Sequence, residues 1–323
     1  MICFSDIHLR EQSEAVAFRV LDWILRAADA DDQRVVFCGD WWHLRYQVNV
    51  RLLNRVAAVM QQWKERGIHV DLLPGNHDQV DVGGANALEI FEAFSNVTVW
   101  TEPGIRTDER WGFVPYRKDH EAQIKALLDV AAEAPKVIFA HYGIKGAVMN
   151  SGRKDQDGIG TPGMECPLVL GHYHKHQQGP GYQYVGSPYQ TSYGEAGNVC
   201  GCLVNGVFTP IDVGAPKHYI IEWDPAVSDE PPPNPGEPHD HVRLDIKATQ
   251  EMIVKGKFKT VLKRSGLDQA QVNVVPVPVQ RELKLTMEQG ESLLHAAERF
   301  ACERLGTTDL DAPMAALRRW ADG

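Results

Sequence analysis

Four short apolar runs in this sequence are each followed at once by residues that can bind a metal ion, and this pattern constrains the fold more than any other feature. The runs and the residues behind them are 34–38 before Gly39-Asp40, 68–73 before Pro74-Gly75-Asn76-His77-Asp78, 136–140 before His141, and 168–170 before Gly171-His172-Tyr173-His174. Between the runs, apolar residues recur every three to four positions, as at Val56, Met60 and Trp63, which predicts helices. Strands that alternate with helices are typical of an α/β layer fold.

The polar residues behind the apolar runs should meet in one place. In open α/β sheets the carboxyl ends of the strands form the ligand crevice. A fifth set, Asp6 and His8, follows the N-terminal apolar segment. Together the five sets offer carboxylate, imidazole and amide groups, which suit Mn²⁺, Fe²⁺ or Zn²⁺ better than Ca²⁺ or Mg²⁺. A carboxylate shared by two such ions would hold them about 3.5–4 Å apart, the separation used in phosphoryl displacement.

The segmentation of the chain predicts a large domain with two appendages. We expect the main domain over residues 1–225 and a proline-rich linker over 226–240, because Pro231-Pro-Pro-Asn-Pro-Gly-Glu-Pro238 cannot continue a helix or a central strand. Residues 241–284 have the pattern of a small βαβ domain. Residues 285–323 have the pattern of a helical tail, with Leu293, Leu294 and Phe300 on one face as core or as a partner-binding stripe.

Composition narrows the class of protein. The 323 residues are 43% hydrophobic and 24% charged, as in ordinary globular proteins, and the formal net charge is −10. That charge argues against a free-standing DNA reader, because phosphate attraction supplies most non-specific affinity. Six cysteines without a CxxC pair suit the reduced thiols of a cytoplasm, and no apolar run approaches the ~20 residues of a membrane span. We expect a cytoplasmic protein that does not contact membranes, in the host cytoplasm if a phage encodes it.

The ordered metal-binding motifs resemble those of the calcineurin-like metallophosphoesterases over residues 1–175. The resemblance implies an α/β sandwich of two central β-sheets flanked by helices. It implies two divalent metal ions, one held by Asp6, His8, Asp40 and His174, the other by Asp40, Asn76, His141 and His172, with Asp40 bridging. It also implies that His77 gives a proton to the leaving oxygen.

A narrower resemblance is to the SbcD-type DNA repair nucleases. It is carried by Gly39-Asp-Trp-Trp-His43, by residues 185–195, and by the order of phosphoesterase domain, small capping domain and helical tail. The length is similar to that of phage recombination nuclease subunits. The resemblance implies hydrolysis of DNA, at ends or hairpins, by a water held between two ions, with Mn²⁺ expected and Fe²⁺, Zn²⁺ or Mg²⁺ as alternatives. It further implies an SbcC-type SMC-like ATPase partner, while formation of a homodimer stays open.

Several residues near the motifs have two readings. His77 is either the proton donor or a structural histidine, and Asp78 either orients His77 or forms a turn. His43 either positions the phosphate or packs against the neighbouring tryptophans. His176 shares the strand parity of His172 and His174, yet we expect it outside the ligand set.

Two other features are equally open. Trp41 and Trp42 can stack on a base or form a wall of the core. The loop over residues 151–158 can bring Arg153 and Lys154 to a phosphate backbone or simply be solvated.

Two other functions compete with DNA hydrolysis. The metal motifs alone do not choose a substrate, so a small-molecule or nucleotide phosphoesterase is the first alternative. A non-catalytic scaffold subunit is the second, and the intact ligand set argues against it. The exo- or endonuclease preference stays open.

Overall fold

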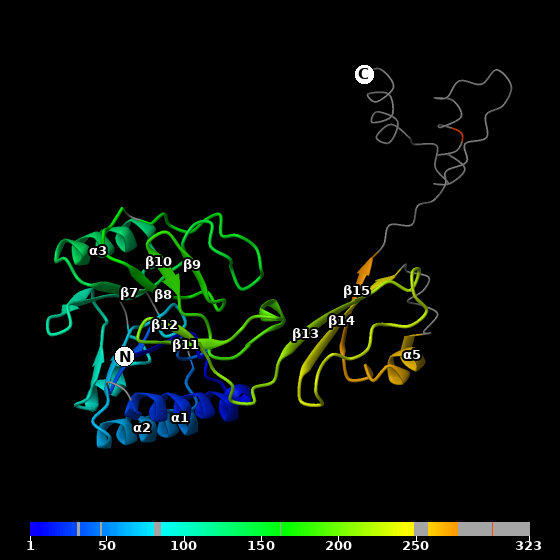
Figure 1. Cartoon of the computed structure of the whole chain (residues 1–323), viewed down its shortest axis with the longest axis horizontal. Coiled ribbons are helices and arrows are strands. Elements are labelled where there is room, and N and C mark those ends of the chain that lie inside the picture. The colour runs from blue at the N-terminus through cyan, green and yellow to red at the C-terminus, as the bar shows by residue number, and fades with distance from the viewer. Residues whose placement is uncertain are drawn as a thin grey trace. The chain divides into compact units, whose positions relative to one another are not determined.

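The computed structural model describes residues 1–30, 33–45, 47–80, 85–161, 163–248 and 258–276, together with residue 299. Two six-stranded mixed β-sheets with flanking helices form most of this part of the chain (Figure 1), so the α/β class predicted from the sequence is confirmed. The helical tail expected over residues 285–323 lies outside the described residues, apart from residue 299.

The first sheet has the order β12-β11-β1-β2-β3-β4, in which β1 to β4 are parallel and β11 and β12 are antiparallel additions. Its strands are β1 (Ile2–Phe4), β2 (Arg34–Phe37), β3 (His69–Leu72), β4 (Val97–Val99), β11 (Gly201–Val204) and β12 (Val207–Pro210). Helices α1 (Glu14–Ala30) and α2 (Val50–Glu65) cover its outer face. The expected helical face is present, since Val56, Met60 and Trp63 of α2 are fully buried there.

The second sheet has the order β5-β6-β7-β8-β10-β9. Its strands are β5 (Gly104–Arg106), β6 (Trp111–Val114), β7 (Val137–His141), β8 (Leu168–Gly171), β9 (Gln177–Gly179) and β10 (Tyr182–Tyr184). Helix α3 (His120–Ala132) packs on the face opposite the first sheet, and Figure 1 places it across the molecule from α1 and α2. Short 3₁₀ turns η1 (Glu11–Ser13), η2 (Glu89–Ala93) and η3 (Tyr193–Glu195) complete this part.

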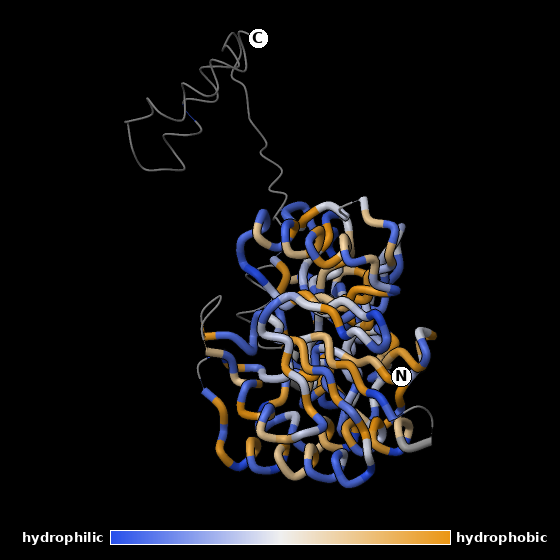
Figure 2. The backbone as a smooth tube through the Cα atoms, turned by 90° about the vertical axis from the view of Figure 1, so that its left-hand side faces the viewer, coloured by the Kyte–Doolittle hydropathy of each residue, from blue (hydrophilic) through white to orange (hydrophobic). Residues whose placement is uncertain are grey.

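An apolar layer lies between the two sheets. Val36 and Leu73 from the first sheet and its loops meet Phe113 and Phe139 from the second, and the two phenylalanine rings stack with centroids 5.3 Å apart. Strands covered on both faces are predominantly apolar, which is why the sequence shows near-continuous apolar runs. In Figure 2 the helical turns along the lower edge alternate between hydrophilic and hydrophobic, as helices covered on one face only should.

A third sheet has the order β13-β14-β15 and includes the expected βαβ pattern. Its elements are β13 (His218–Trp223), β14 (His241–Ala248), α5 (Phe258–Arg264) and β15 (Gln271–Pro276). β13 pairs with β14 in parallel across the proline-rich segment, so that segment joins two neighbouring strands. The small sheet thus begins within residues 1–225, while the expected domain boundaries stay a prediction.

The loop over residues 190–195 connects the small sheet to the rest of its compact unit, which comprises residues 1–247 and 256–275. The side chain of Gln190 accepts a hydrogen bond from the backbone N–H of His218 at 2.6 Å, and the Tyr193 hydroxyl donates to the carbonyl of Val242 at 3.3 Å. The guanidinium of Arg243 lies 5.5 Å from the centroid of the Tyr193 ring.

A buried ion pair links the two large sheets. Asp71 of β3 is 1% exposed, and it accepts hydrogen bonds from Arg106 Nε of β5 at 3.1 Å and from Trp100 Nε1 at 2.8 Å. Burial raises the pKa of Asp71, and the Arg106 hydrogen bond and charge oppose that rise. The pair therefore stabilises the sheet-to-sheet contact only while both partners are present.

We expect Asp71→Asn to lower the free energy of unfolding by roughly 2–3 kcal/mol, because Arg106 then keeps a charge beside a neutral amide. Urea denaturation followed by circular dichroism measures the change. The matched control is Asp129→Asn, whose carboxylate is 61% exposed and pairs with Lys125 on the surface of α3, and it should change stability by no more than about 0.5 kcal/mol. Equal effects of the two substitutions would contradict the linking role of Asp71.

Candidate metal centre

The structure brings all seven expected ligand residues to one end of the two sheets. The loops that carry them follow β1, β2, β3, β7 and β8, whose carboxyl ends lie side by side in the parallel parts of the sheets. The residues are Asp6 and His8 after β1, Asp40 after β2, Asn76 after β3, His141 as the last residue of β7, and His172 and His174 after β8.

The first cluster consists of Asp6, His8 and His174, all of them buried. The Nε2 atoms of His8 and His174 are 3.0 Å apart, and His174 Nε2 lies 3.7 Å from Asp6 Oδ1. His8 Nε2 is also 3.7 Å from Asp40 Oδ2. Three side chains from two loops, those after β1 and β8, thus point their ligand atoms at one small volume.

The second cluster consists of Asp40, Asn76, His141 and His172. Asn76 Oδ1 is 3.1 Å from His141 Nε2 and 3.0 Å from His172 Nδ1. Asp40 Oδ1 lies 3.5 Å from His141 Nε2. One oxygen of Asp40 therefore faces the first cluster and the other faces the second, which is the arrangement needed for a shared carboxylate ligand.

The donor set fits metal ions rather than a closed hydrogen-bond network. His141 Nδ1 lies 2.7 Å from the carbonyl of Cys38, and His174 Nδ1 lies 2.8 Å from a carboxylate oxygen of Glu195. Since those acceptors require the N–H on Nδ1, the Nε2 lone pairs of both rings point inward. There they meet carboxylate oxygens of Asp6 and Asp40, which are acceptors as well. Acceptors that converge in this way require protons or cations between them.

The electrostatics of the buried groups agree with that requirement. Burial lowers the pKa of His141, but the Asp40 carboxylate beside it raises the pKa more, to about 9. Burial and the neighbouring His141 lower the pKa of His172 to about 3, which keeps its ring neutral and able to bind a metal. The two clusters thus attract positive charge, and their buried His and Asp side chains can hold metal ions.

The backbone at the site is strained. Asp6, His8, Asp40 and His172 have φ values of 53°, 42°, 62° and 100°, in the left-handed region that non-glycine residues rarely adopt. Each such residue costs on the order of 1–3 kcal/mol and persists where the surroundings enforce it. Gly75 shows how crowded the surroundings are, because a Cβ there would overlap the Asp40 carboxylate and backbone.

Glu195 supports the first cluster and was not identified as a site residue from the sequence. Its carboxylate is fully buried and accepts hydrogen bonds from His174 Nδ1 at 2.8 Å and from the backbone N–H of Thr191 at 2.9 Å. Burial raises the pKa of Glu195, but the His174 and Thr191 contacts outweigh it and bring the pKa to about 2. A carboxylate held this way fixes the tautomer and orientation of a metal-binding histidine. The only sequence signal for it was its place at the end of segment 185–195.

His77 lies beside both clusters. Its backbone N–H donates to Asp40 Oδ1 at 2.8 Å, and its Nδ1 lies 2.8 Å from the carbonyl of His43. Its ring stands edge-on to that of His8, with centroids 4.8 Å apart. A ring that donates through Nδ1 leaves Nε2 free for a substrate or a metal, and His77 does form a possible ligand group with His8 and Asp40.

His43 and Asp78 have different surroundings. The His43 ring is half-buried, stacks on His77 at 6.0 Å and lies 3.1 Å from the Arg10 guanidinium. Asp78 was expected either to orient His77 or to form a turn, and its carboxylate accepts from the backbone N–H groups of Asp40, Trp42 and Gly75 at 2.8–3.0 Å. Asp78 therefore fastens the loop after β2 to the loop after β3. Burial and the Asp40 charge raise the pKa of Asp78 to about 7.

The tryptophans and His176 are structural. Trp41 and Trp42 are 0% and 2% exposed, so they form a wall of the core and cannot stack on a base. His176 Nδ1 lies 2.8 Å from the carbonyl of Tyr184, and its ring stacks on Phe208. His176 is thus outside the ligand set, as expected.

The loop over 151–158 and Tyr116 border the clusters. Asp155 anchors the loop by accepting from the Tyr173 hydroxyl and the backbone N–H of Gly158, while Arg153 and Lys154 are exposed. Sequence reasoning missed Tyr116, whose ring is roughly parallel to that of His172 at 6.4 Å.

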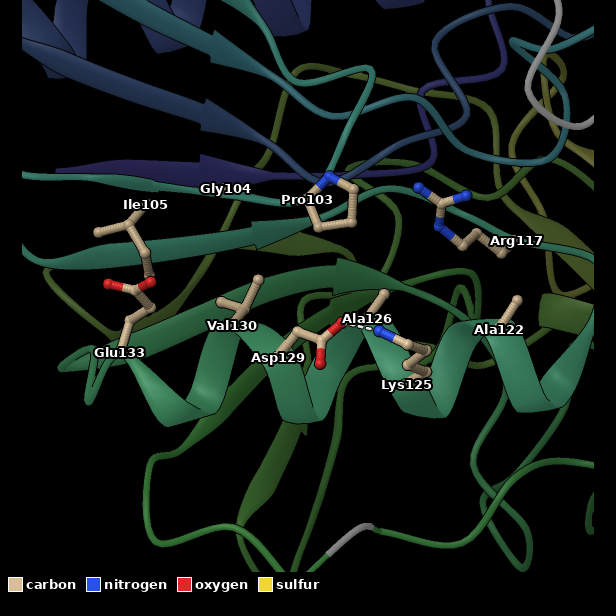
Figure 3. Close-up of a pocket in the computed structure, with 10 residues that line it drawn as sticks. All are labelled: Pro103, Gly104, Ile105, Arg117, Ala122, Lys125, Ala126, Asp129, Val130 and Glu133. Carbon is tan, nitrogen blue, oxygen red and sulfur yellow. Dashed lines mark hydrogen bonds and ion pairs between the residues drawn. The ribbon is translucent and has the colours of Figure 1, made fainter.

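A surface cavity of about 570 Å³ lies away from the candidate metal centre. It lies between α3 and the segment Pro103–Ile105, and Figure 3 shows Ala122, Ala126 and Val130 along the helical side. None of the seven ligand residues lines it. This cavity is therefore separate from the candidate metal centre.

Comparisons with known proteins add no family assignment. No family model matches the chain, and no curated protein matches it either. Among the described residues, no helix has the length and apolar character that a membrane span requires.

We expect Gly75→Ala to lower the free energy of unfolding by about 1–3 kcal/mol and to reduce bound Mn²⁺, because the new methyl group displaces Asp40. Calorimetric melting and metal analysis measure the two effects. Gly160→Ala is the matched control, since a Cβ there meets no atom within 4 Å. If Gly75→Ala has the same melting temperature and the same Mn²⁺ content as Gly160→Ala, Gly75 does not approach Asp40 as closely as the structure shows.

We expect Glu195→Gln to weaken the affinity for Mn²⁺ by about 10- to 100-fold, because the neutral amide fixes His174 less firmly and brings an N–H₂ group against Thr191. Competition with a chelating indicator measures the affinity. Glu133→Gln, an exposed residue just after α3, is the control and should bind Mn²⁺ as the wild type does. An unchanged affinity in Glu195→Gln would exclude the supporting role of Glu195.

Proposed function

We propose that this protein is a phosphodiesterase that depends on two metal ions and hydrolyses DNA, as the nuclease subunit of an SbcCD-type recombination and repair complex. The observation that carries the proposal is the position of Asp40, whose two oxygens lie 3.7 Å from His8 Nε2 and 3.5 Å from His141 Nε2. This position supports a shared carboxylate, and two clusters joined by one suit a reaction at a phosphorus atom.

The proposed ligands divide between the clusters. Asp6, His8, Asp40 and His174 hold one ion, and Asp40, Asn76, His141 and His172 hold the other. When bound, such ions neutralise charge on phosphoryl oxygens and lower the pKa of water towards neutrality. Mn²⁺ is the proposed ion because the donor set mixes imidazole with oxygen ligands.

His77 is the proposed general acid. The carbonyl of His43, 2.8 Å from His77 Nδ1, supports a ring orientation that leaves Nε2 free to give a proton to the leaving sugar oxygen. The hydrogen bond from the His77 backbone to Asp40 keeps the ring next to the proposed bridging ligand. His43 is proposed to position the phosphate on the same side, and Asp78 to hold the two ligand loops together.

DNA ends or hairpins are the proposed substrates, with an SMC-like ATPase as the partner that brings the DNA. The support is the likeness of residues 39–43 and 185–195 to SbcD-type nucleases. A partner that brings the DNA would also compensate for the net charge of −10, which alone disfavours DNA binding. The expected docking tail lies outside the described residues, and a homodimer is part of the same proposal.

We expect His77→Ala to lower Mn²⁺-dependent cleavage of linear DNA by about 10²- to 10⁴-fold without loss of bound metal, because general acid catalysis contributes a factor of that size. Gel assays measure cleavage and metal analysis measures the ions. His120→Ala, an exposed residue at the start of α3, is the control and should retain both.

The outcomes separate the alternatives. Loss of both activity and one metal ion in His77→Ala would make His77 a ligand rather than the acid. Turnover of an aryl phosphodiester without any DNA cleavage would favour the small-molecule phosphoesterase. A purified chain without a transition metal would favour the scaffold.

A further inference from the structure

A second cavity adjoins the first metal cluster. It has a volume of about 260 Å³, and its wall includes the ligand His8 together with Arg10, Thr191, His218 and His241. These residues come from the loop after β1, the loop after β10, and the starts of β13 and β14. We call it the Arg10 cavity. His8 belongs to both, so the cavity borders the first cluster directly.

Arg10 gives the cavity a positive charge that no carboxylate among the described residues pairs with. Its guanidinium lies 3.1 Å from His43 Nε2 and 3.5 Å from the carbonyl of Thr191. Among the described residues, no carboxylate lies within ion-pair distance of it, whereas Arg51 and Arg55 both pair with Glu14. An arginine is charged at all working pH values and presents five donors, so Arg10 keeps donors available for an anion.

The rest of the wall is also suited to an anion. The rings of His218 and His241 lie 4.7 Å apart, and the Gln190 hydrogen bond to the His218 backbone holds them at the wall. No Asp or Glu is among the described residues that line the cavity. The nearby Asp240 carboxylate accepts from the backbone of Lys217 and Glu237. Imidazole and guanidinium groups without carboxylates favour a phosphate.

The order of the side chains indicates where along a substrate this phosphate sits. His77, the proposed proton donor, stacks on His43, and His43 contacts Arg10. The direction from His77 through His43 to Arg10 therefore leads away from the proposed scissile bond, on the side of the leaving oxygen.

We propose that the Arg10 cavity binds the phosphate one nucleotide beyond the scissile bond on the leaving-group side, so that the preferred substrate is a nucleotide chain rather than an isolated diester. The proposal rests on the proposed phosphodiesterase function. Arg10 is then a specificity residue. A diester without a second phosphate does not form the ionic contact with the Arg10 guanidinium.

Three thymidine dinucleotides test the proposal, because each contains a single phosphodiester bond. They are TpT, pTpT with an added 5′-phosphate and TpTp with an added 3′-phosphate. We expect the wild type with Mn²⁺ to favour pTpT or TpTp over TpT by about tenfold in kcat/KM, the factor of one charge-assisted contact. In Arg10→Ala the preference should fall below about threefold. Arg10→Lys should keep part of it, since a positive charge remains.

Matched variants guard the interpretation. Arg26→Ala, an exposed arginine on α1 outside the cavity wall, should keep the wild-type preference. His241→Ala should reduce the preference, and it carries the test with Arg10→Lys if Arg10→Ala does not fold. A wild type that treats the three dinucleotides alike, or an Arg10→Ala that keeps the preference, overturns the proposal.

A binding measurement separates failure of the cavity proposal from failure of the proposed function. Fluorescence polarisation with fluorescein-labelled (dT)₆ needs no hydrolysis. Arg10→Ala should lower the magnitude of the slope of log K against log salt by about 0.7, the value of one lost contact to a single strand. If no dinucleotide is hydrolysed but this slope changes, the phosphodiesterase function fails and the cavity stands. If the dinucleotides are hydrolysed without preference and the slope is unchanged, the cavity proposal fails alone.

Discussion

The arrangement of the candidate metal centre depends on the contacts of the Asp40 carboxylate. It is 2% exposed and lies between imidazoles from two different sheets, His8 after β1 and His141 at the end of β7. A buried carboxylate without compensating partners would cost several kcal/mol. The backbone N–H of His77 satisfies part of its hydrogen-bonding capacity, and the imidazoles face the rest. The geometry of both clusters therefore follows from the position of one side chain.

Asp78 stabilises the backbone around that side chain. Its carboxylate accepts three backbone N–H groups, two from the loop after β2 and one from the loop after β3. Those bonds offset the cost of the left-handed backbone at Asp40. The strain is concentrated at the candidate metal centre: among the described residues, eight non-glycine residues have positive φ, and four of them are expected ligand residues.

Sequence patterns predicted the elements and the ligands better than the groups that support them. The apolar runs predicted β2, β3, β7 and β8 because strands covered on both faces are predominantly apolar. The convergence of the seven expected ligand residues could be predicted because each lies at, or shortly after, the carboxyl end of a strand. Asp78 could not be placed correctly, since its three partners are backbone amides whose positions depend on the folded loops. Glu195 was missed for the same reason, because it approaches His174 only after two distant loops meet. The joining of β13 to β14 was also missed, because the proline-rich segment between them was read as a linker between domains.

The loop over residues 190–195 has a mechanical consequence. Gln190 and Tyr193 of this loop bind the small sheet at His218 and Val242, and Glu195 of the same loop binds His174. Because all of these attachments lie within six consecutive residues, the loop can absorb little displacement. A force that pulls the small sheet must therefore break two hydrogen bonds or tilt the imidazole of His174. Tension applied to one part of the chain is in this way converted into a change of ligand geometry at another.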